Sequence, residues 1–221
     1  MEFRKEQIKE IKLEDNNYPF LLKQIGSPPN SIFVIGDEKI LNKNCMTVVG
    51  SRKMTDYGRK MTEKFTKDLV ARDLVIVPGL ARGIDGMAHR MCLKYGGKTV
   101  AVLGHGLDRI YPPEHQGLAK EIVLAGGCLL TEFPLNYGIE KKNFILRDRI
   151  MAGLSLGTLV VEGKSKSGTK ITATMAANYS REVFCVPGPV NSQLSEGPAD
   201  LIQEGAKLVT KVEDILEELK L

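Results

Sequence analysis

Residues able to bind an anion follow a short apolar stretch near the start of this 221-residue chain. Thr47–Val49 is followed by Gly50, Ser51 and Arg52. In an open α/β sheet, ligands bind beyond the carboxyl ends of the strands, where helix starts leave backbone N–H groups free. Gly50 lets the backbone approach a ligand, and Ser51 and Arg52 can donate hydrogen bonds to it. We therefore expect an anion-binding turn, although a glycine turn with a surface arginine also explains this tripeptide.

The carboxyl ends of the expected strands also carry glycine or small polar residues. Five of them finish in glycine or a small polar residue, at Gly50-Ser51, Pro78-Gly79, Gly104, Thr131-Glu132 and Glu162-Gly163. Because parallel strands present their carboxyl ends at one edge of a sheet, these residues are expected to form a common rim. A flexible, phosphate-bearing ligand could contact the backbone there.

A basic and aromatic segment begins at Lys141. Lys141-Lys142-Asn143-Phe144 leads into Arg147-Asp148-Arg149. Aromatic rings beside phosphate-binding cations are typical of proteins that bind single-stranded nucleic acid, and stacking contributes about 1–3 kcal/mol per base. Alternatively, Phe144 anchors the core, and Arg147 or Arg149 pairs with acids such as Glu132 or Asp148. The residues alone leave both interpretations open.

Two glycine-rich segments approach known phosphate motifs without completing them. Residues 104–109 begin like a dinucleotide fingerprint, but Arg109 replaces the last glycine and no helix is expected there. Residues 163–170 have the glycine spacing of a phosphate loop with lysine and threonine exchanged, which argues against ATP hydrolysis. Ser167 or Thr169 at a helix start could still hold an anion or simply cap the helix.

No metal or cofactor is expected. Asp85 and the three histidines lack a metal-ligand spacing, and Asp85 is expected to cap or orient the helix that it begins. The four cysteines are scattered without a CxxC pair, which argues against structural zinc or a disulfide framework.

Strand and helix patterns alternate from residue 46 onward. The expected strands are 46–49, 74–77, 98–103, 128–131, 158–161, 182–186 and 207–209, and the expected helices are 57–70, 84–94, 112–125, 145–153, 169–180, 200–203 and 212–219. This alternation predicts an α/β fold with a doubly wound, mostly parallel sheet and helices on both faces. Residues 1–45 are expected to be a lead-in with one strand at 31–35, and residues 1–20 to form a short amphipathic helix or a loose arm. Residues 46–221 are expected to form the main domain.

Composition restricts the function classes only loosely. The chain is 43% hydrophobic and 26% charged, which suits a folded α/β domain. A formal net charge of +4 permits a nucleic-acid or phosphate ligand without requiring one. The absence of a signal-peptide pattern and of a long apolar run predicts a cytoplasmic protein that does not enter a membrane.

Taken together, these segments resemble the bacterial DNA-processing protein A family (DprA, also called Smf). The resemblance covers about residues 18–215, and its motifs are highly specific when combined. The matching residues are Val48–Arg52, Gly79–Asp85, Ala88-His89, Gly96–Gly104, Gly106–Asp108, Ile110–Pro112, Arg149–Ser155, Ser167–Thr169, Ile171–Ala173, Val186–Gly188 and Gly205–Val209.

The resemblance implies an extended Rossmann-like fold that binds single-stranded DNA without sequence preference. It also implies a dimer that loads the RecA recombinase onto incoming strands during natural transformation, and a protein that is not an enzyme. Gly50, Ser51 and Arg52 resemble the family's phosphate-binding turn, Lys141 its backbone cation and Phe144 its stacking platform. The remaining expected DNA-binding residues are Gly79, Arg82, Asn143, Arg147, Arg149, Gly168 and Thr169. The expected dimer edge contains Ala199, Leu201, Ile202 and Leu208.

The chain departs from the family pattern in several places. Pro78 stands where serine is usual, Asp148 where asparagine is usual, and Pro113 where some members have lysine. A carboxylate at Asp148 could weaken anion binding locally. The family's N-terminal helical domain and C-terminal winged-helix domain are expected to be absent.

Two other functions use the same rim. One is a nucleotide phosphoribohydrolase of a related Rossmann family, but its PGGxGTxxE turn is missing and Glu162 is only its nearest substitute. The other is a nucleotide sensor that binds a phosphate ligand without chemistry.

Overall fold

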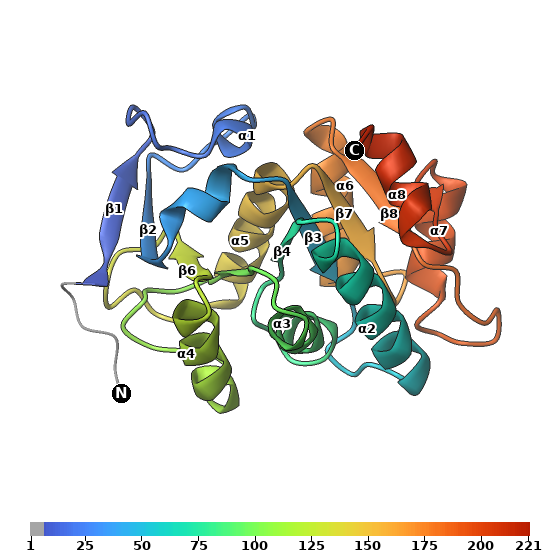
Figure 1. Cartoon of the computed structure of the whole chain (residues 1–221). Coiled ribbons are helices and arrows are strands. Elements are labelled where there is room, and N and C mark those ends of the chain that lie inside the picture. Colours follow the sequence, from blue (N-terminus) through green and yellow to red (C-terminus); the bar gives the residue numbers. More distant parts are fainter. Residues whose placement is uncertain (1–6) are drawn as a thin grey trace.

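A twisted sheet built from two groups of strands runs through the molecule and carries helices on both faces (Figure 1). The computed structural model describes residues 7–221. Within them, the strands lie in two hydrogen-bonded groups, β1-β2-β6-β5 and β4-β3-β7-β8-β9, and a parallel bridge between Ile76 and Thr99 joins β4 to the start of β5. The strands are β1 (Lys9–Lys12), β2 (Ser31–Gly36), β3 (Cys45–Val49), β4 (Val75–Val77), β5 (Val100–Val102), β6 (Cys128–Thr131), β7 (Gly157–Val160), β8 (Glu182–Cys185) and β9 (Lys207–Leu208).

The predicted α/β fold with a mostly parallel sheet is confirmed. All paired strands from β3 to β9 run parallel, whereas β2 is antiparallel to β6 and β1 is antiparallel to β2. Buried, β-branched stretches such as the one ending at Val49 suit strands that are covered on both faces.

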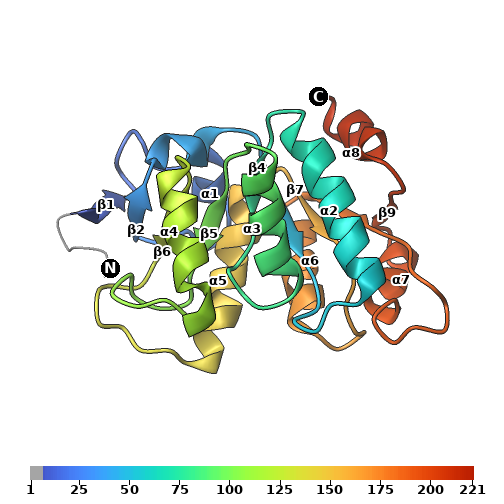
Figure 2. The same ribbon diagram turned by 60° about the horizontal axis from the view of Figure 1, so that its bottom comes forward.

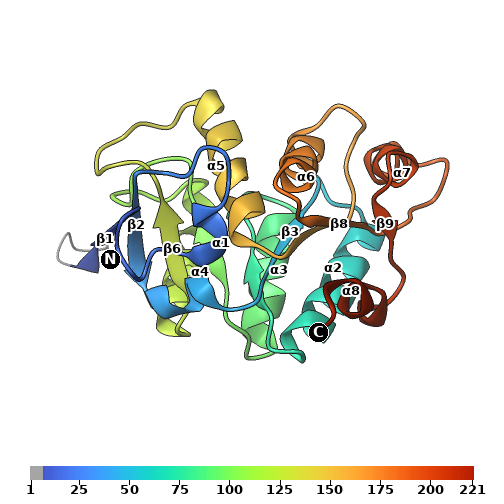
Figure 3. The same ribbon diagram turned by 90° about the horizontal axis from the view of Figure 1, so that it is seen from above.

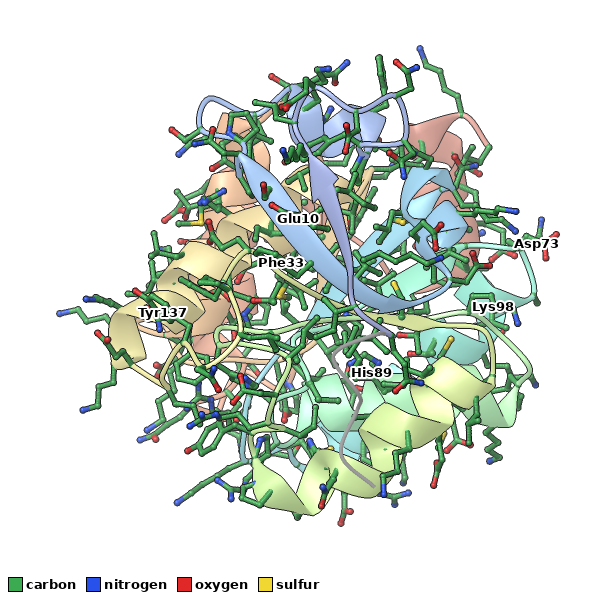
Figure 4. All side chains as sticks on the ribbon, turned by 90° about the vertical axis from the view of Figure 1, so that its left-hand side faces the viewer. Glu10, Phe33, Asp73, His89, Lys98 and Tyr137 are labelled. Atoms are coloured by element: carbon green, nitrogen blue, oxygen red, sulfur yellow. The ribbon has the colours of Figure 1, made fainter. Side chains whose placement is uncertain are left out.

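The expectation of a helix or loose arm over residues 1–20 was wrong where the structure describes that segment. Lys9–Lys12 forms β1, whose Glu10 lies opposite Phe33 of β2 (Figure 4). Only Ile11 of this strand is buried. The spacing of apolar residues in this segment therefore could not distinguish a strand from a helix. Pairing with the apolar strand β2 determines the conformation of this charged segment. Residues 1–6 of the predicted arm lie outside the described part.

Helices cover each face of the sheet in a separate group. α1 (Phe20–Lys23), α5 (Lys141–Leu154), α6 (Gly168–Asn178) and α7 (Glu196–Gln203) lie on one face. α2 (Asp56–Val70), α3 (Ile84–Lys94), α4 (Gln116–Leu124) and α8 (Val212–Leu219) lie on the other (Figure 3). Successive residues of β3 alternate between the two cores, with Val49 packing among the first group and Val48 among the second.

Helix α5 begins earlier than its pattern predicts. The sequence predicts a helix from 145, but α5 starts at Lys141 and therefore includes the basic and aromatic residues. The preceding segment, 133–140, is irregular. Two 3-10 helices complete the described elements, η2 (Glu38–Asn42) and η3 (Pro113–His115). Among the residues described, no helix has the length and apolar character needed to cross a membrane.

Candidate nucleic-acid interface

A cavity of about 850 Å³ opens at the carboxyl ends of the central strands. Its walls come from the turn after β3, the loop after β7 and the first turns of α5 and α6. Figure 2 shows the start of α5 and the loop before α2 at the same edge of the molecule. Eight of the predicted DNA-binding residues line this cavity: Gly50, Ser51, Arg52, Lys141, Phe144, Arg147, Gly168 and Thr169. Gly79, Arg82, Asn143 and Arg149 are not among its lining residues.

The turn after β3 is held by the loop after β7 and by the start of α3. The Ser51 N–H donates to the Glu162 carbonyl oxygen at 2.9 Å, and the Ser51 carbonyl accepts from the Ile84 N–H at 3.1 Å. A Cβ on Gly50 would lie 2.5 Å from Cγ1 of Ile84, so only glycine fits there without a shift. Further along, the Glu162 carboxylate accepts from the backbone N–H and the hydroxyl of Thr55, both at 2.8 Å. The turn is thus fixed before any ligand arrives.

Five cations at the mouth of the cavity have no carboxylate partner among the described residues. Their side chains are exposed, and they come from three separate segments: Arg52 and Lys53, Lys141, and Lys164 and Lys166. α6 also begins at this wall, and its N-cap, Ser167, makes no side-chain cap hydrogen bond. Unpaired cations and free helix-start N–H groups favour an anionic ligand.

Two guanidinium groups lie near the Phe144 ring. The Cζ atoms of Arg52 and Arg147 are 5.7 Å and 5.8 Å from the centre of its ring. The ring is only partly buried and forms part of the cavity wall, so it does not act purely as a core anchor. Tyr111 is a second aromatic residue of the wall, 37% exposed, with its ring centre 5.9 Å from that of Phe144. Sequence reasoning did not assign Tyr111 to the site, because nothing local to the loop after β5 shows that it meets α5.

Arg147 lies in the cavity wall, but it is buried at the floor and not exposed at the mouth. It is 4% exposed, and its Nη1 donates to the carbonyl oxygens of Gly79 at 2.6 Å and Val102 at 3.0 Å. Its Nε lies 3.0 Å from Oδ1 of Asp148. A side chain on Gly79 would overlap the Arg147 guanidinium, so that glycine makes room for an arginine and not for a ligand.

Three other predicted contacts are occupied within the protein. Arg149 pairs with Glu132 and donates to the Ser27 carbonyl at 2.9 Å, which agrees with the alternative that these arginines bind acids. Asn143 is fully buried and donates to the Gly138 carbonyl at 3.2 Å. Arg82 is exposed but pairs with Glu114. Each side chain stabilises a loop near the cavity instead of facing it.

Two carboxylates accompany Arg147 at the floor. Asp85 is 6% exposed and accepts from the Gly79 N–H at 2.9 Å, so it holds the loop that leads into α3. Burial raises the pKa of Asp85, although the nearby Arg147 opposes the shift. Burial likewise raises the pKa of Asp148 to about 6, again against the effect of Arg147.

The histidines contribute to the fold. His89 of α3 is buried, with Nδ1 2.8 Å from the Thr99 hydroxyl, and burial lowers its pKa to about 3 (Figure 4). It is therefore neutral. Within residues 7–221, no group of three or more His, Cys, Asp or Glu side chains is placed to hold a metal ion.

The expected dimer residues divide into two kinds. Leu201 is 5% exposed and packs in the core, so its side chain is not available to a partner, contrary to the expectation. Leu208 lies on the edge strand β9 and is 46% exposed. Ala199 is exposed and Ile202 is partly exposed on α7.

Comparison with known proteins identifies the family to which the chain belongs. The family model described as DNA recombination-mediator protein A matches residues 9–220. The chain therefore belongs to the DNA recombination-mediator protein A family.

Individual relatives agree with that assignment. Protein Smf of Escherichia coli is 43% identical over 95% of this chain, and the match spans 56% of the relative's length. DNA processing protein A of Streptococcus pneumoniae superimposes with a TM-score of 0.91 at 41% identity, covering 98% of this chain and 75% of that one. The Helicobacter pylori protein superimposes with a TM-score of 0.85 at 26% identity, covering 97% and 96%, and was described for its single-stranded DNA binding mode.

Proposed function

We propose that this protein binds single-stranded DNA along the mouth of the cavity. The observation that carries the proposal is the group of five exposed cations that line the cavity together with Phe144 and have no carboxylate partner among residues 7–221. The sugar-phosphate chain contacts Arg52, Lys141 and the start of α6, and a base stacks on Phe144. Because phosphate contacts supply most of the affinity, strands of any sequence bind.

The proposal extends to recombination. A protein that holds a single strand by its backbone leaves much of that strand accessible to a recombinase, so we propose that it loads RecA onto incoming DNA in the cytoplasm during natural transformation. The family membership and the DNA-binding mode described for the H. pylori relative support this role. A DNA-binding role of this kind requires no catalytic residue.

A titration of fluorescent oligothymidine at several salt concentrations tests the binding site. Log affinity should fall linearly with log salt, with a slope of about −0.7 per phosphate contact. Arg52→Ala and Lys141→Ala should each weaken binding and reduce the slope by about one contact, because each removes an exposed cation. Phe144→Ala should weaken binding by about 1–3 kcal/mol with the slope unchanged, because it removes stacking only.

Lys120→Ala, on α4 away from the cavity, is the matched control for removing a cation. Affinity that does not depend on salt, or affinity unchanged from that of the parent in all three site variants, would reject the proposed site. RecA filament formation on protein-coated DNA should decrease in the same order as the affinities of the variants.

A further inference from the structure

Helix α2 presents a row of lysines to the solvent. Lys60, Lys64 and Lys67 are exposed and lie on the face of the helix opposite the buried Phe65. Their spacing of four and then three residues aligns them along the helix axis. Lys64 donates to the Thr210 carbonyl at 2.7 Å, which leaves its charge uncompensated. Figure 2 shows α2 on the outer surface of the molecule, and we call these three side chains the α2 lysine row.

The α2 lysine row has no carboxylate partner among residues 7–221. Two acids of the same helix, Asp56 and Glu63, lie three or four residues from these lysines but bind other groups. Asp56 is 3.6 Å from Arg59. Glu63 accepts from Lys94 at 2.7 Å and from the Tyr95 hydroxyl at 2.9 Å. Because like charges three and four residues apart on a helix repel one another, an anion would stabilise this surface.

The row connects two basic regions at opposite edges of the sheet. α2 begins just after Lys53, one of the cations at the mouth of the cavity. Its other end borders a second groove of about 1020 Å³ at the amino ends of β3 and β4. A helix of 15 residues is roughly 22 Å long, so the row covers the distance between the two edges.

The second groove is also basic. Its charged lining residues are four cations and one acid: Lys43, Lys67, Arg72 and Lys98 with Asp73. Figure 4 shows Lys98 and Asp73 at this edge of the molecule. Arg72 is 3.6 Å from Glu213, whereas the three lysines have no carboxylate partner in the described part of the chain.

This groove suits phosphate groups and not an inserted base. The ammonium groups of Lys67 and Lys94 lie 5.8 Å and 5.1 Å from the ring centre of Tyr95, so its ring already contacts cations. α2 and α3 both end at the groove, and the carboxyl ends of helices disfavour an anion held deep inside. Phosphates would therefore contact the exposed ends of the lysine side chains, and such contacts position a strand without reading its bases.

We propose that a long single strand leaves the cavity at Lys53 and follows the α2 lysine row to the second groove, an inference that rests on the proposed DNA-binding function. The row contacts phosphates only, so it adds affinity for long strands of any sequence. A strand that is just long enough to occupy the cavity does not reach the row.

Oligothymidines of two lengths test this path. Tetrathymidine occupies the cavity alone, and a strand of about 20 nucleotides is long enough to reach the groove. In the parent protein, log affinity should fall more steeply with log salt for the long strand, by a slope of at least about two, since the row adds three phosphate contacts of about 0.7 each. The greater number of binding positions on a long strand raises its affinity without changing that slope.

The row variant replaces Lys60, Lys64 and Lys67 by alanine, which favours the helix and leaves the cavity intact. Its affinity for the long strand should be lower than that of the parent. The ratio of the two affinities should grow about 20-fold when salt is lowered from 200 mM to 50 mM, because three phosphate contacts are lost. Its affinity for tetrathymidine should equal that of the parent.

A matched control variant replaces three lysines on other elements by alanine: Lys12 of β1, Lys23 of α1 and Lys120 of α4. It has the same net charge as the row variant, so the two differ only in where the cations were removed. The control should bind the long strand nearly as tightly as the parent. Melting curves establish that both variants are folded.

The outcomes separate the path from the proposed function. Equal salt slopes of the parent for the two strands overturn the inference, whether or not the row variant folds. Equal losses in the row variant and in the control also overturn it, because the effect would then come from net charge alone. No binding of either strand at low salt rejects the proposed function itself, which is a different result.

Discussion

At the scale of single residues, pairing within the protein separates the side chains available to a ligand from those that support the cavity. Arg52 and Lys141 are exposed without an acidic partner among the described residues, whereas Arg149 is paired with Glu132. Arg147 lies on the cavity wall but is held from below by two carbonyl oxygens. From charge alone, all four of these basic side chains would be expected to bind DNA.

Asp148 also makes stability depend on pH. Burial raises its pKa to about 6 from an ordinary value of 3.8, so the folded state binds a proton more tightly than the unfolded state. Its contribution to stability is therefore fully present below pH 4 and decreases as the pH rises to 6. Asp148→Asn removes this dependence, and the variant should gain on the order of 1–3 kcal/mol relative to the parent between pH 4 and pH 7.

Urea unfolding of both proteins at the two pH values measures the effect. Acids with lowered pKa, such as Glu38 and Asp214, shift the stability of both proteins in the opposite direction and cancel in the difference. A difference between the two proteins that stays constant with pH would contradict the prediction.

At the scale of elements, the cavity depends on where loops end and helices begin. The start of α5 at Lys141 brings Lys141 and Phe144 onto the first turn of a helix, and Arg147 onto the turn below. The loop after β4 accommodates that arginine only because position 79 is glycine. One side of the site therefore depends on the packing of a loop against a helix.

Gly79→Ala should destabilise the protein. The added methyl group would overlap the Arg147 guanidinium, and overpacking of this kind costs about 1–3 kcal/mol. Gly117→Ala on α4 is the matched control, because a Cβ there meets nothing within 4 Å and alanine favours the helix. Chemical unfolding measures both, and equal stabilities of the two variants would show that Arg147 moves aside freely.

At the scale of the whole molecule, two edge strands end the sheet among the described residues, β1 and β9. Leu208 on β9 is 46% exposed. Unpaired edge strands with exposed apolar side chains favour pairing with another chain, so we propose that the protein forms a dimer through this edge.

Leu208→Glu should convert the dimer to a monomer, because it places a charge in an apolar contact. Light scattering or sedimentation measures the mass. Leu124→Glu on α4 is the control, since Leu124 is 86% exposed on an element far from β9 in the sheet order. A parent protein that is monomeric at all concentrations, or a dimer that survives the substitution, would contradict the proposal.

Local patterns were sufficient to predict the central strands. Apolar, β-branched stretches bounded by glycine located β6 at 128–131 as observed and placed β3 within one residue of its start. They could not reveal β1, because its conformation comes from pairing with β2. Nor could they show that Arg147 is buried, because its partner Gly79 lies 68 residues away in the chain. Contacts between distant segments decide which polar groups remain free.

The junction between β4 and β5 gives Arg147 a mechanical importance. The ladder there consists of a single bridge, between Ile76 and Thr99, and the Arg147 guanidinium spans the junction further up by holding Gly79 on one side and Val102 on the other. One side chain thus links the two strand groups and also forms the base of the cavity. A change in the separation of the two halves of the sheet would therefore displace a residue of the cavity wall.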